Sequence, residues 1–222
     1  MTSRWQAEKR EVARAARKAA ELGLVAGTSG NVSVRLPADG ERGLLAITAL
    51  GARCGALSDA DIVVVDHDAE PVEGDLAPSS ETMLHVAIYR SRPDVGAVVH
   101  THAVYSSVAS VTGMEVPPIV DEMVVNIGGA VRVSEYAFPG TQGMAGNVCT
   151  ALGDRNAAII RNHGAVGVGR NLREALDACI MTERMAKIFV LSSLTGQVAT
   201  LPDDVVEAEA AIFQMRRRSA LD

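Results

Sequence analysis

The stretch VGAVVHTH, residues 95–102, is an apolar run that ends in two histidines one residue apart. Such a run predicts a buried strand over Val95–His100. Because alternate residues of a strand point to the same face, His100 and His102 can direct both imidazoles at one point. This arrangement is typical of a metal site, but two unrelated histidines remain an open alternative because the motif alone is weak.

A third histidine, His163, lies in the sequence RNHG at residues 161–164. Residues 157–161 predict a buried strand and residues 172–193 predict a long helix. We therefore expect His163 in a strand-to-helix loop, where site residues are common. Three neutral imidazoles that leave one coordination position open form a catalytic site for zinc or a related divalent ion.

The rest of the chain predicts a single domain in which helices flank a sheet. Strands and helices mix without strict alternation, and there is no internal repeat or long linker. The continuous apolar run at residues 62–65 indicates a strand with both faces covered. We expect a hairpin turn at residues 37–43, helices at residues 4–22, 81–90 and 103–111, and further strands at residues 32–36 and 44–48.

The composition excludes several classes of protein. The 222 residues are 48% hydrophobic, enough for one sizeable core, and carry a net charge of −6. An acidic balance argues against nucleic-acid binding, and no apolar stretch reaches the ~18 residues of a membrane helix. Cys54, Cys149 and Cys179 show neither a disulfide framework nor a paired-cysteine zinc motif, which favours free thiols in a reducing cytosol. We therefore expect a cytoplasmic protein without a nucleic-acid or membrane partner.

Glu81 follows two serines, Ser79 and Ser80, at a predicted helix start. A serine N-cap with an acid in the first turn explains one serine and the glutamate. Hydroxyls and free N–H groups at a helix N-terminus could instead hold a phosphate, and the local sequence leaves both interpretations open. His85, one helical turn beyond Glu81, is expected to be structural.

Two further segments are ambiguous in isolation. GTSGN, residues 27–31, is either a flexible turn or a cradle of N–H donors for an anion. Asp121 and Glu122 lie at a predicted helix start, where paired acids usually interact with the helix dipole. One acid near a metal could instead transfer protons.

Taken in order, the motifs resemble the class II, metal-dependent sugar-phosphate aldolase family, above all its L-fuculose-1-phosphate aldolase members. The resemblance covers nearly the whole chain, and the ordered set is far more specific than any single motif. It rests on GTSGNVSVR (27–35), ITALG (47–51), PSSET (78–82), AVVHTHAVYSS (97–107) and RNHGAVGVGRNLREAL (161–176).

The resemblance implies an α/β fold, with one domain over residues 1–222 and a mostly antiparallel central sheet flanked by helices. It also implies a homotetramer with sites between subunits, and one divalent ion per subunit, with zinc expected and manganese or cobalt as alternatives. By motif match, His100, His102 and His163 would be metal ligands, and Glu81 would be the catalytic carboxylate that can also touch the metal. The phosphate of a small sugar-phosphate substrate would bind at Thr28, Gly30, Asn31, Gly51, Ser79 and Ser80.

The reaction implied by the resemblance is aldol cleavage of a ketose 1-phosphate, such as L-fuculose 1-phosphate or a 5-deoxypentulose 1-phosphate, to dihydroxyacetone phosphate and a small aldehyde. The metal would stabilise the enediolate, and Glu81 would move protons. A 4-epimerase, a sugar-acid phosphate decarboxylase or a dehydratase on the same scaffold are the alternatives. A non-catalytic scaffold is disfavoured because it has no need for Glu81 and all three histidines.

Two positions and the C-terminal tail depart from the family pattern. Leu50 stands where the phosphate loop usually has threonine, so one hydroxyl contact is lost. Glu122 stands at about the position of a tyrosine that acts across the subunit boundary in fuculose aldolases, and related dehydratases carry a catalytic glutamate there. The resemblance therefore makes Glu122 the second catalytic candidate. Residues 216–222 contain no tyrosine, unlike members with a reactive tail tyrosine.

Overall fold

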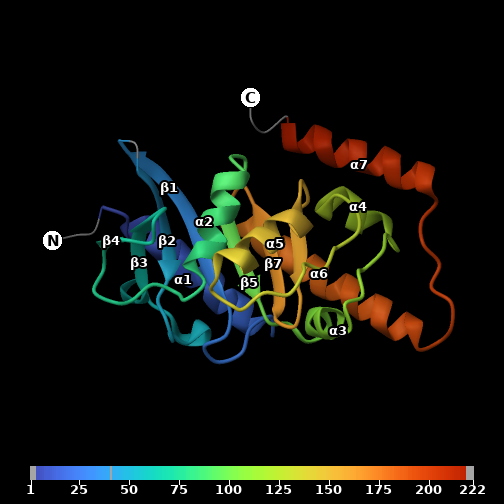
Figure 1. Ribbon diagram of the computed structural model, residues 1–222, viewed down its shortest axis with the longest axis horizontal. Coiled ribbons are helices and arrows are strands. Elements are labelled where there is room, and N and C mark those ends of the chain that lie inside the picture. The colour runs from blue at the N-terminus through green and yellow to red at the C-terminus, as the bar shows by residue number, and fades with distance from the viewer. Residues whose placement is uncertain (1–3, 41, 219–222) are drawn as a thin grey trace.

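The computed structural model describes residues 4–40 and 42–218, which form a seven-stranded sheet with helices on both faces (Figure 1). The strand order is β4-β3-β2-β1-β5-β7-β6, and each neighbouring pair is antiparallel. The expected single domain with a mostly antiparallel sheet is confirmed. In chain order the elements are α1 (Gln6–Glu21), β1 (Asn31–Asp39), β2 (Arg42–Thr48), the 3-10 turns Cys54–Ala56 and Asp59–Asp61, β3 (Ile62–Asp66), β4 (Pro71–Glu73), α2 (Thr82–Ser91), β5 (Ala97–Thr101), α3 (Val104–Thr112), α4 (Asp121–Ile127), α5 (Gln142–Leu152), β6 (Ala157–Ile160), β7 (Gly164–Gly169), α6 (Leu172–Ser193) and α7 (Asp203–Arg218).

Apolar side chains of the sheet divide between two layers because successive residues of a strand face opposite sides. Val98 packs in one layer with α2 and α5, whereas Ala97 and Val99 pack in the other with α1 and α6. His100 shares the orientation of Val98 and therefore points toward the α2 side. The residues of β3 are buried throughout, as the continuous apolar run predicts.

Strand β7 corrects the expected surroundings of His163. The expected strand-to-helix loop is wrong, because Gly164–Gly169 forms a strand and His163 lies in the hairpin turn between β6 and β7. Glycine has a low β propensity, which hides this strand in the sequence. Close packing against α6 requires glycine at position 167. A Cβ on Gly167 would lie 2.6 Å from the Ala175 carbonyl oxygen and 2.6 Å from Cys179 Sγ.

Helix α3 begins just after the paired histidines and is capped by a side chain of α6. Glu183 accepts hydrogen bonds from the backbone N–H groups of Tyr105 and Ser106, each at 2.8 Å, and from the Ser106 hydroxyl. First-turn N–H groups have no partner within their own helix, and a carboxylate there also suits the helix dipole. This cap fixes the direction in which the chain leaves His102.

Helix α7 packs against α4 along the upper right of the view in Figure 1. Phe213 is buried, and its ring lies so close to Gly128 that a Cβ there would be 2.6 Å away. Arg217 pairs with Asp94 at 2.9 Å. Arg216, Arg217 and Arg218 form the last turn of this helix, and residues 219–222 lie outside the described residues.

Some element limits differ from the sequence expectation. The expected turn at residues 37–43 is too long, because β1 runs to Asp39 and β2 begins at Arg42, and these two residues pair. Helix α5 was not predicted, since its sequence QGMAGNVCTAL includes glycine, threonine and cysteine, which are poor helix formers. The Thr141 side chain caps it by accepting from the Met144 N–H.

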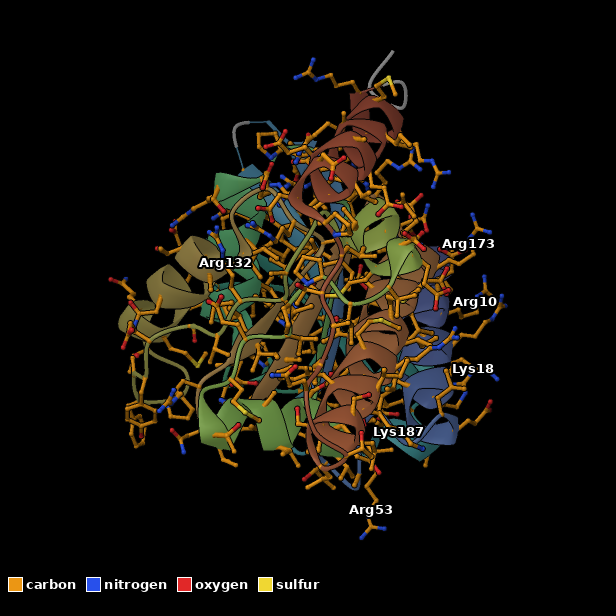
Figure 2. All side chains as sticks on the ribbon, turned by 90° about the vertical axis from the view of Figure 1, so that its right-hand side faces the viewer. Arg10, Lys18, Arg53, Arg132, Arg173 and Lys187 are labelled. Atoms are coloured by element: carbon orange, nitrogen blue, oxygen red, sulfur yellow. The ribbon has the colours of Figure 1, made fainter. Side chains whose placement is uncertain are left out.

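The outer faces of α1 and α6 are strongly polar. Figure 2 shows Arg10 and Lys18 of α1 and Arg173 of α6 extending away from the body of the molecule, and all three are exposed. In the described part of the chain, no helix is both long enough and apolar enough to cross a bilayer.

Candidate active site

The fold brings the three histidines to one point. His100 lies on β5, paired with Asn31 of β1 on one side and Val166 of β7 on the other. His102 follows the end of the same strand, and the β6–β7 turn places His163 beside both. The Nε2 atoms of His100 and His102 are 2.9 Å apart, and one nitrogen from each of the three rings lies within 4.8 Å of the others.

The protonation of these rings favours metal binding. Nδ1 of His100 lies 2.9 Å from the Ala165 carbonyl oxygen, which can only accept, so Nδ1 carries the proton. Nε2 is therefore the nitrogen of this ring that can offer a lone pair to a metal ion. Burial, reinforced by His100 and His163, lowers the pKa of His102 to about 4, and burial also lowers the pKa of His163. At neutral pH the latter two rings are uncharged, as metal coordination requires.

Glu81 completes the cluster from the N-terminal start of α2. Its Oε2 lies 3.2 Å from His100 Nε2 and accepts a hydrogen bond from Asn31 at 2.8 Å, while Oε1 lies 3.3 Å from His163 Nε2. Burial raises the pKa of the Glu81 carboxyl, but His100, His163 and the Asn31 hydrogen bond outweigh it and hold this pKa below its usual value. The carboxylate is therefore ionised at neutral pH.

The serine pair before α2 does not cap the helix in the way that simple capping predicts. Glu81 itself occupies the N-cap position, and its side chain turns to the histidines and makes no cap hydrogen bond. The Ser79 hydroxyl accepts from the Glu81 N–H at 3.3 Å, and Ser80 is exposed. The interpretation with a serine N-cap and Glu81 in the first turn is therefore wrong.

A pocket of about 240 Å³ opens beside the histidines. Glu81, His102 and His163 form part of its wall. The described residues that line it include no lysine or arginine, so an anion there would be held by N–H groups and hydroxyls. The residues expected at the phosphate site all line this pocket: Thr28, Gly30, Asn31, Gly51, Ser79 and Ser80.

Known proteins resemble this chain over most of its length. The family described as Class II Aldolase and Adducin N-terminal domain matches residues 10–190. The chain belongs to this family. The 5-deoxy-D-ribulose 1-phosphate aldolase of Bacillus thuringiensis serovar kurstaki is 32% identical over 209 residues, which cover 94% of this chain and 96% of that relative. The L-fuculose phosphate aldolase of Escherichia coli (strain K12) is 36% identical over 83% of this chain and 84% of its own.

A solved structure of an L-fuculose 1-phosphate aldolase shares the fold. Its TM-score is 0.87 at 35% identity, and the match covers 96% of this chain and 98% of that one. The family match and the relatives together establish an enzyme of the class II aldolase type.

The cluster fits the divalent ion that class II aldolases use. Nε2 of His100 lies 3.2 Å from Glu81 Oε2 and 2.9 Å from His102 Nε2, so three atoms of the kinds that ligate a divalent ion converge on one point. Glu81 Oε1 is buried without a hydrogen-bond partner, which a metal ion would supply. His100, His102 and His163 would hold the ion, with Glu81 beside it.

Glu122 lies outside this pocket within a single chain. It occupies the first turn of α4, where an acid suits the helix dipole, and it pairs with Arg184 of α6 at 3.0 Å. The chain itself therefore does not bring Glu122 to the histidines. A role at the site would require a neighbouring subunit, as the family resemblance implies.

Ser110 of α3 holds the turn that carries His163, a role that the sequence alone does not reveal. The buried Ser110 hydroxyl accepts from the His163 N–H at 2.8 Å and donates to the Ile160 carbonyl at 2.6 Å. Asn162, in the same turn, adopts φ +54°, which asparagine tolerates better than most residues. No local signal reveals this contact, because Ser110 and His163 are joined only by the fold.

One further pocket residue, Pro139, is found only from the fold. Pro139 lines the pocket, and a Cβ on Gly140 would lie 2.8 Å from the Ser80 carbonyl oxygen. The Pro-Gly pair marks a turn, but nothing near it in the sequence directs that turn to Ser80. Leu50 is 59% exposed at the pocket wall, so an aliphatic side chain stands where family members usually present a hydroxyl.

Proposed function

We propose that this enzyme cleaves a ketose 1-phosphate to dihydroxyacetone phosphate and a small aldehyde, with L-fuculose 1-phosphate and 5-deoxypentulose 1-phosphates as the first candidates. One observation carries the proposal: the three imidazoles cluster with an ionised Glu81, and Glu81, His102 and His163 open onto a pocket for an anion that no lysine or arginine lines. Relatives named as aldolases for L-fuculose phosphate and 5-deoxy-D-ribulose 1-phosphate support this substrate class.

The ion belongs to the proposal as well. We take zinc first, with manganese or cobalt as alternatives, because a three-imidazole set suits all of them. One ion per subunit at His100, His102 and His163 would act as a Lewis acid toward negative charge on the substrate oxygens. Glu81, lying 3.3 Å from His163 Nε2 through Oε1, is placed to take a proton from the substrate and to return it.

The phosphate would fix the substrate without taking part in bond cleavage. Thr28 and Ser80 offer hydroxyls at the pocket, and Gly30 and Gly51 offer backbone approach at φ +77° and φ +70°. Gly30 has no room for a side chain, since a Cβ would lie 2.7 Å from the His100 carbonyl oxygen. Asn31 and Ser79 complete this part of the site.

A retro-aldol assay tests the function. The zinc- or manganese-loaded enzyme would receive L-fuculose 1-phosphate, D-ribulose 1-phosphate or 5-deoxyribulose 1-phosphate, and dihydroxyacetone phosphate would be followed through an NADH-consuming dehydrogenase. Metal-dependent release, absent from a Glu81→Gln variant that retains its metal, is the expected result. Metal-loaded, folded enzyme that releases no dihydroxyacetone phosphate from any of them would reject the aldolase proposal in favour of the epimerase, decarboxylase or dehydratase alternatives.

We also propose a homotetramer in which Glu122 contributes to a neighbouring subunit's site. The position of Glu122 outside its own chain's pocket supports this arrangement. In Glu122→Gln, a large fall in kcat with metal retained is expected. Near-normal kinetics would leave Glu122 as a partner of the helix dipole and Arg184, and light scattering would test the tetramer separately.

A single domain over residues 1–222 and a cytoplasmic location complete the proposal. The family match to residues 10–190 supports the domain extent. The free thiols of Cys54, Cys149 and Cys179 support a reducing compartment.

A further inference from the structure

A row of polar side chains runs between α2 and β1, behind the pocket. Residues four apart on a helix share a face, and residues two apart on a strand do the same. Four helical residues rise about 6 Å and two strand residues about 6.6 Å, so the two sets stay in step. This α2–β1 polar row consists of Glu81, His85 and Tyr89 from α2 with Asn31, Ser33 and Arg35 from β1.

Short contacts link the row from Glu81 to Tyr89. Asn31 Nδ2 lies 2.8 Å from Glu81 Oε2, and Asn31 Oδ1 lies 2.5 Å from His85 Nε2. His85 Nδ1 lies 2.6 Å from the Ser33 hydroxyl, which lies 2.7 Å from the Tyr89 hydroxyl. His85 and Ser33 are fully buried and Tyr89 is nearly so, which leaves no access for water to replace these bonds.

The direction of every hydrogen bond follows from Glu81. An ionised carboxylate only accepts, so Asn31 presents its N–H to Glu81 and its oxygen to His85. That oxygen also only accepts, so His85 Nε2 carries the proton. Burial lowers the pKa of His85 to about 3, so the ring is neutral and Nδ1 accepts from Ser33. Tyr89 then donates to Ser33.

We propose that His85 is a positioning residue for Glu81, because its Nε2–H holds the Asn31 amide with Nδ2 toward the carboxylate. Without this donor, the amide is free to turn over and place Oδ1 against Glu81. Two acceptors repel each other, so the carboxylate would lose its fixed place beside His100 and His163. Asn31 also lines the anion pocket, so the row connects the carboxylate to the phosphate side of the site.

Kinetics of two His85 variants test this role, in an assay that rests on the proposed function. His85→Leu removes both ring nitrogens, whereas His85→Gln retains a side-chain N–H. We expect His85→Leu to lower kcat by about tenfold or more, with KM and bound metal near wild type, and His85→Gln to recover most of the loss. Arg90→Gln, on the exposed side of the same helix, is the matched control and should retain wild-type kinetics.

Two kinetic outcomes would overturn the positioning role. One is a folded, metal-loaded His85→Leu enzyme with wild-type kcat. The other is an equal loss in the leucine and glutamine variants, since rescue by an N–H donor is the distinguishing result. If the leucine variant does not fold, the kinetics of His85→Gln and the nitrogen-15 NMR spectrum described next test the positioning role.

Nitrogen-15 NMR of histidine-labelled, zinc-loaded protein reads the tautomer without any substrate, so it is independent of the aldolase reaction. The His85 signals would be assigned by their loss in His85→Gln. A protonated Nε2 and an unprotonated Nδ1 are expected. A proton on Nδ1, or on both nitrogens, would contradict the bond directions and overturn the proposal.

Discussion

His100 is the residue on which the metal centre depends most. It is fully buried, its Nδ1 proton is held by the Ala165 carbonyl, and its Nε2 faces both His102 and Glu81. His100→Ala should therefore abolish metal binding and activity together, while circular dichroism shows that the fold is retained. Metal content by mass spectrometry is the measurement. Full activity in a metal-free variant would reject the site.

Ser110 should affect metal affinity without contacting the metal. Ser110→Ala leaves the His163 N–H and the Ile160 carbonyl without their partner, which costs about 1–3 kcal/mol for buried groups. We expect weaker zinc binding in a competition titration and a lower urea midpoint. Ser107→Ala on the same helix is the control. Equal zinc affinity in both variants would show that Ser110 does not set the position of His163.

His85 should make the stability of the fold decrease at acidic pH. Its folded pKa of about 3, caused mainly by burial, lies below the unfolded value near 6.5. Between these values the unfolded chain binds more protons, so stability is complete above about pH 6.5 and falls as the pH drops toward 3. Each pKa unit corresponds to about 1.4 kcal/mol. Urea unfolding of metal-free protein should show a shallower acid decline in His85→Gln, and identical slopes would contradict the expectation.

The sequence reveals the paired histidines but not their supporting contacts. His100 and His102 are recognisable because their spacing matches the period of a strand. The sequence predicts only a structural role for His85 and does not reveal its hydrogen-bond partners. These partners, Asn31 and Ser33, lie more than 50 residues earlier in the chain. Such pairing depends on how a helix and a strand are aligned in space, which no local pattern encodes.

At the scale of elements, replacing a glycine by alanine should change the free energy of unfolding in opposite directions in β7 and in α5. Gly167→Ala would force a Cβ within 2.6 Å of α6 backbone and should destabilise the protein by about 1–3 kcal/mol or more. Gly146→Ala lies in a helix with nothing within 4 Å of the added Cβ, so it should stabilise by roughly 0.5–1 kcal/mol. Urea denaturation of both variants is the measurement, and changes of the same sign would refute the packing argument.

Elements with a clear hydrophobic period are predicted well, and the others are not. Helix α6 matches its expected limits, Leu172–Ser193, because its apolar positions recur at helical spacing. Strand β7 is missed because Gly167 and Gly169 serve the close approach of α6, a reason that lies outside the strand itself. Where packing against a neighbour selects the residue, local propensity misleads.

At the scale of the whole molecule, the metal centre joins distant parts of the chain. Its residues come from the start of α2, the end of β5 and the β6–β7 turn. An ion that binds only the folded state stabilises it by an amount that grows with the free metal concentration. The melting temperature should therefore fall on treatment with a chelator and recover with added zinc. A chelator-insensitive melting temperature in a protein shown to bind zinc would contradict this linkage.

Both edge strands of the sheet offer little free backbone for pairing with a further strand. At one end β4 spans only Pro71–Glu73 and begins with a proline, which has no N–H to offer. At the other, Ile159 of β6 is already bonded through its N–H to the Arg132 carbonyl and through its carbonyl to the Ser134 N–H. At high concentration, copies of the chain therefore have little unpaired backbone through which to form an amyloid-like intermolecular sheet. Assembly between copies must instead use side chains, which can be selective about partner and geometry.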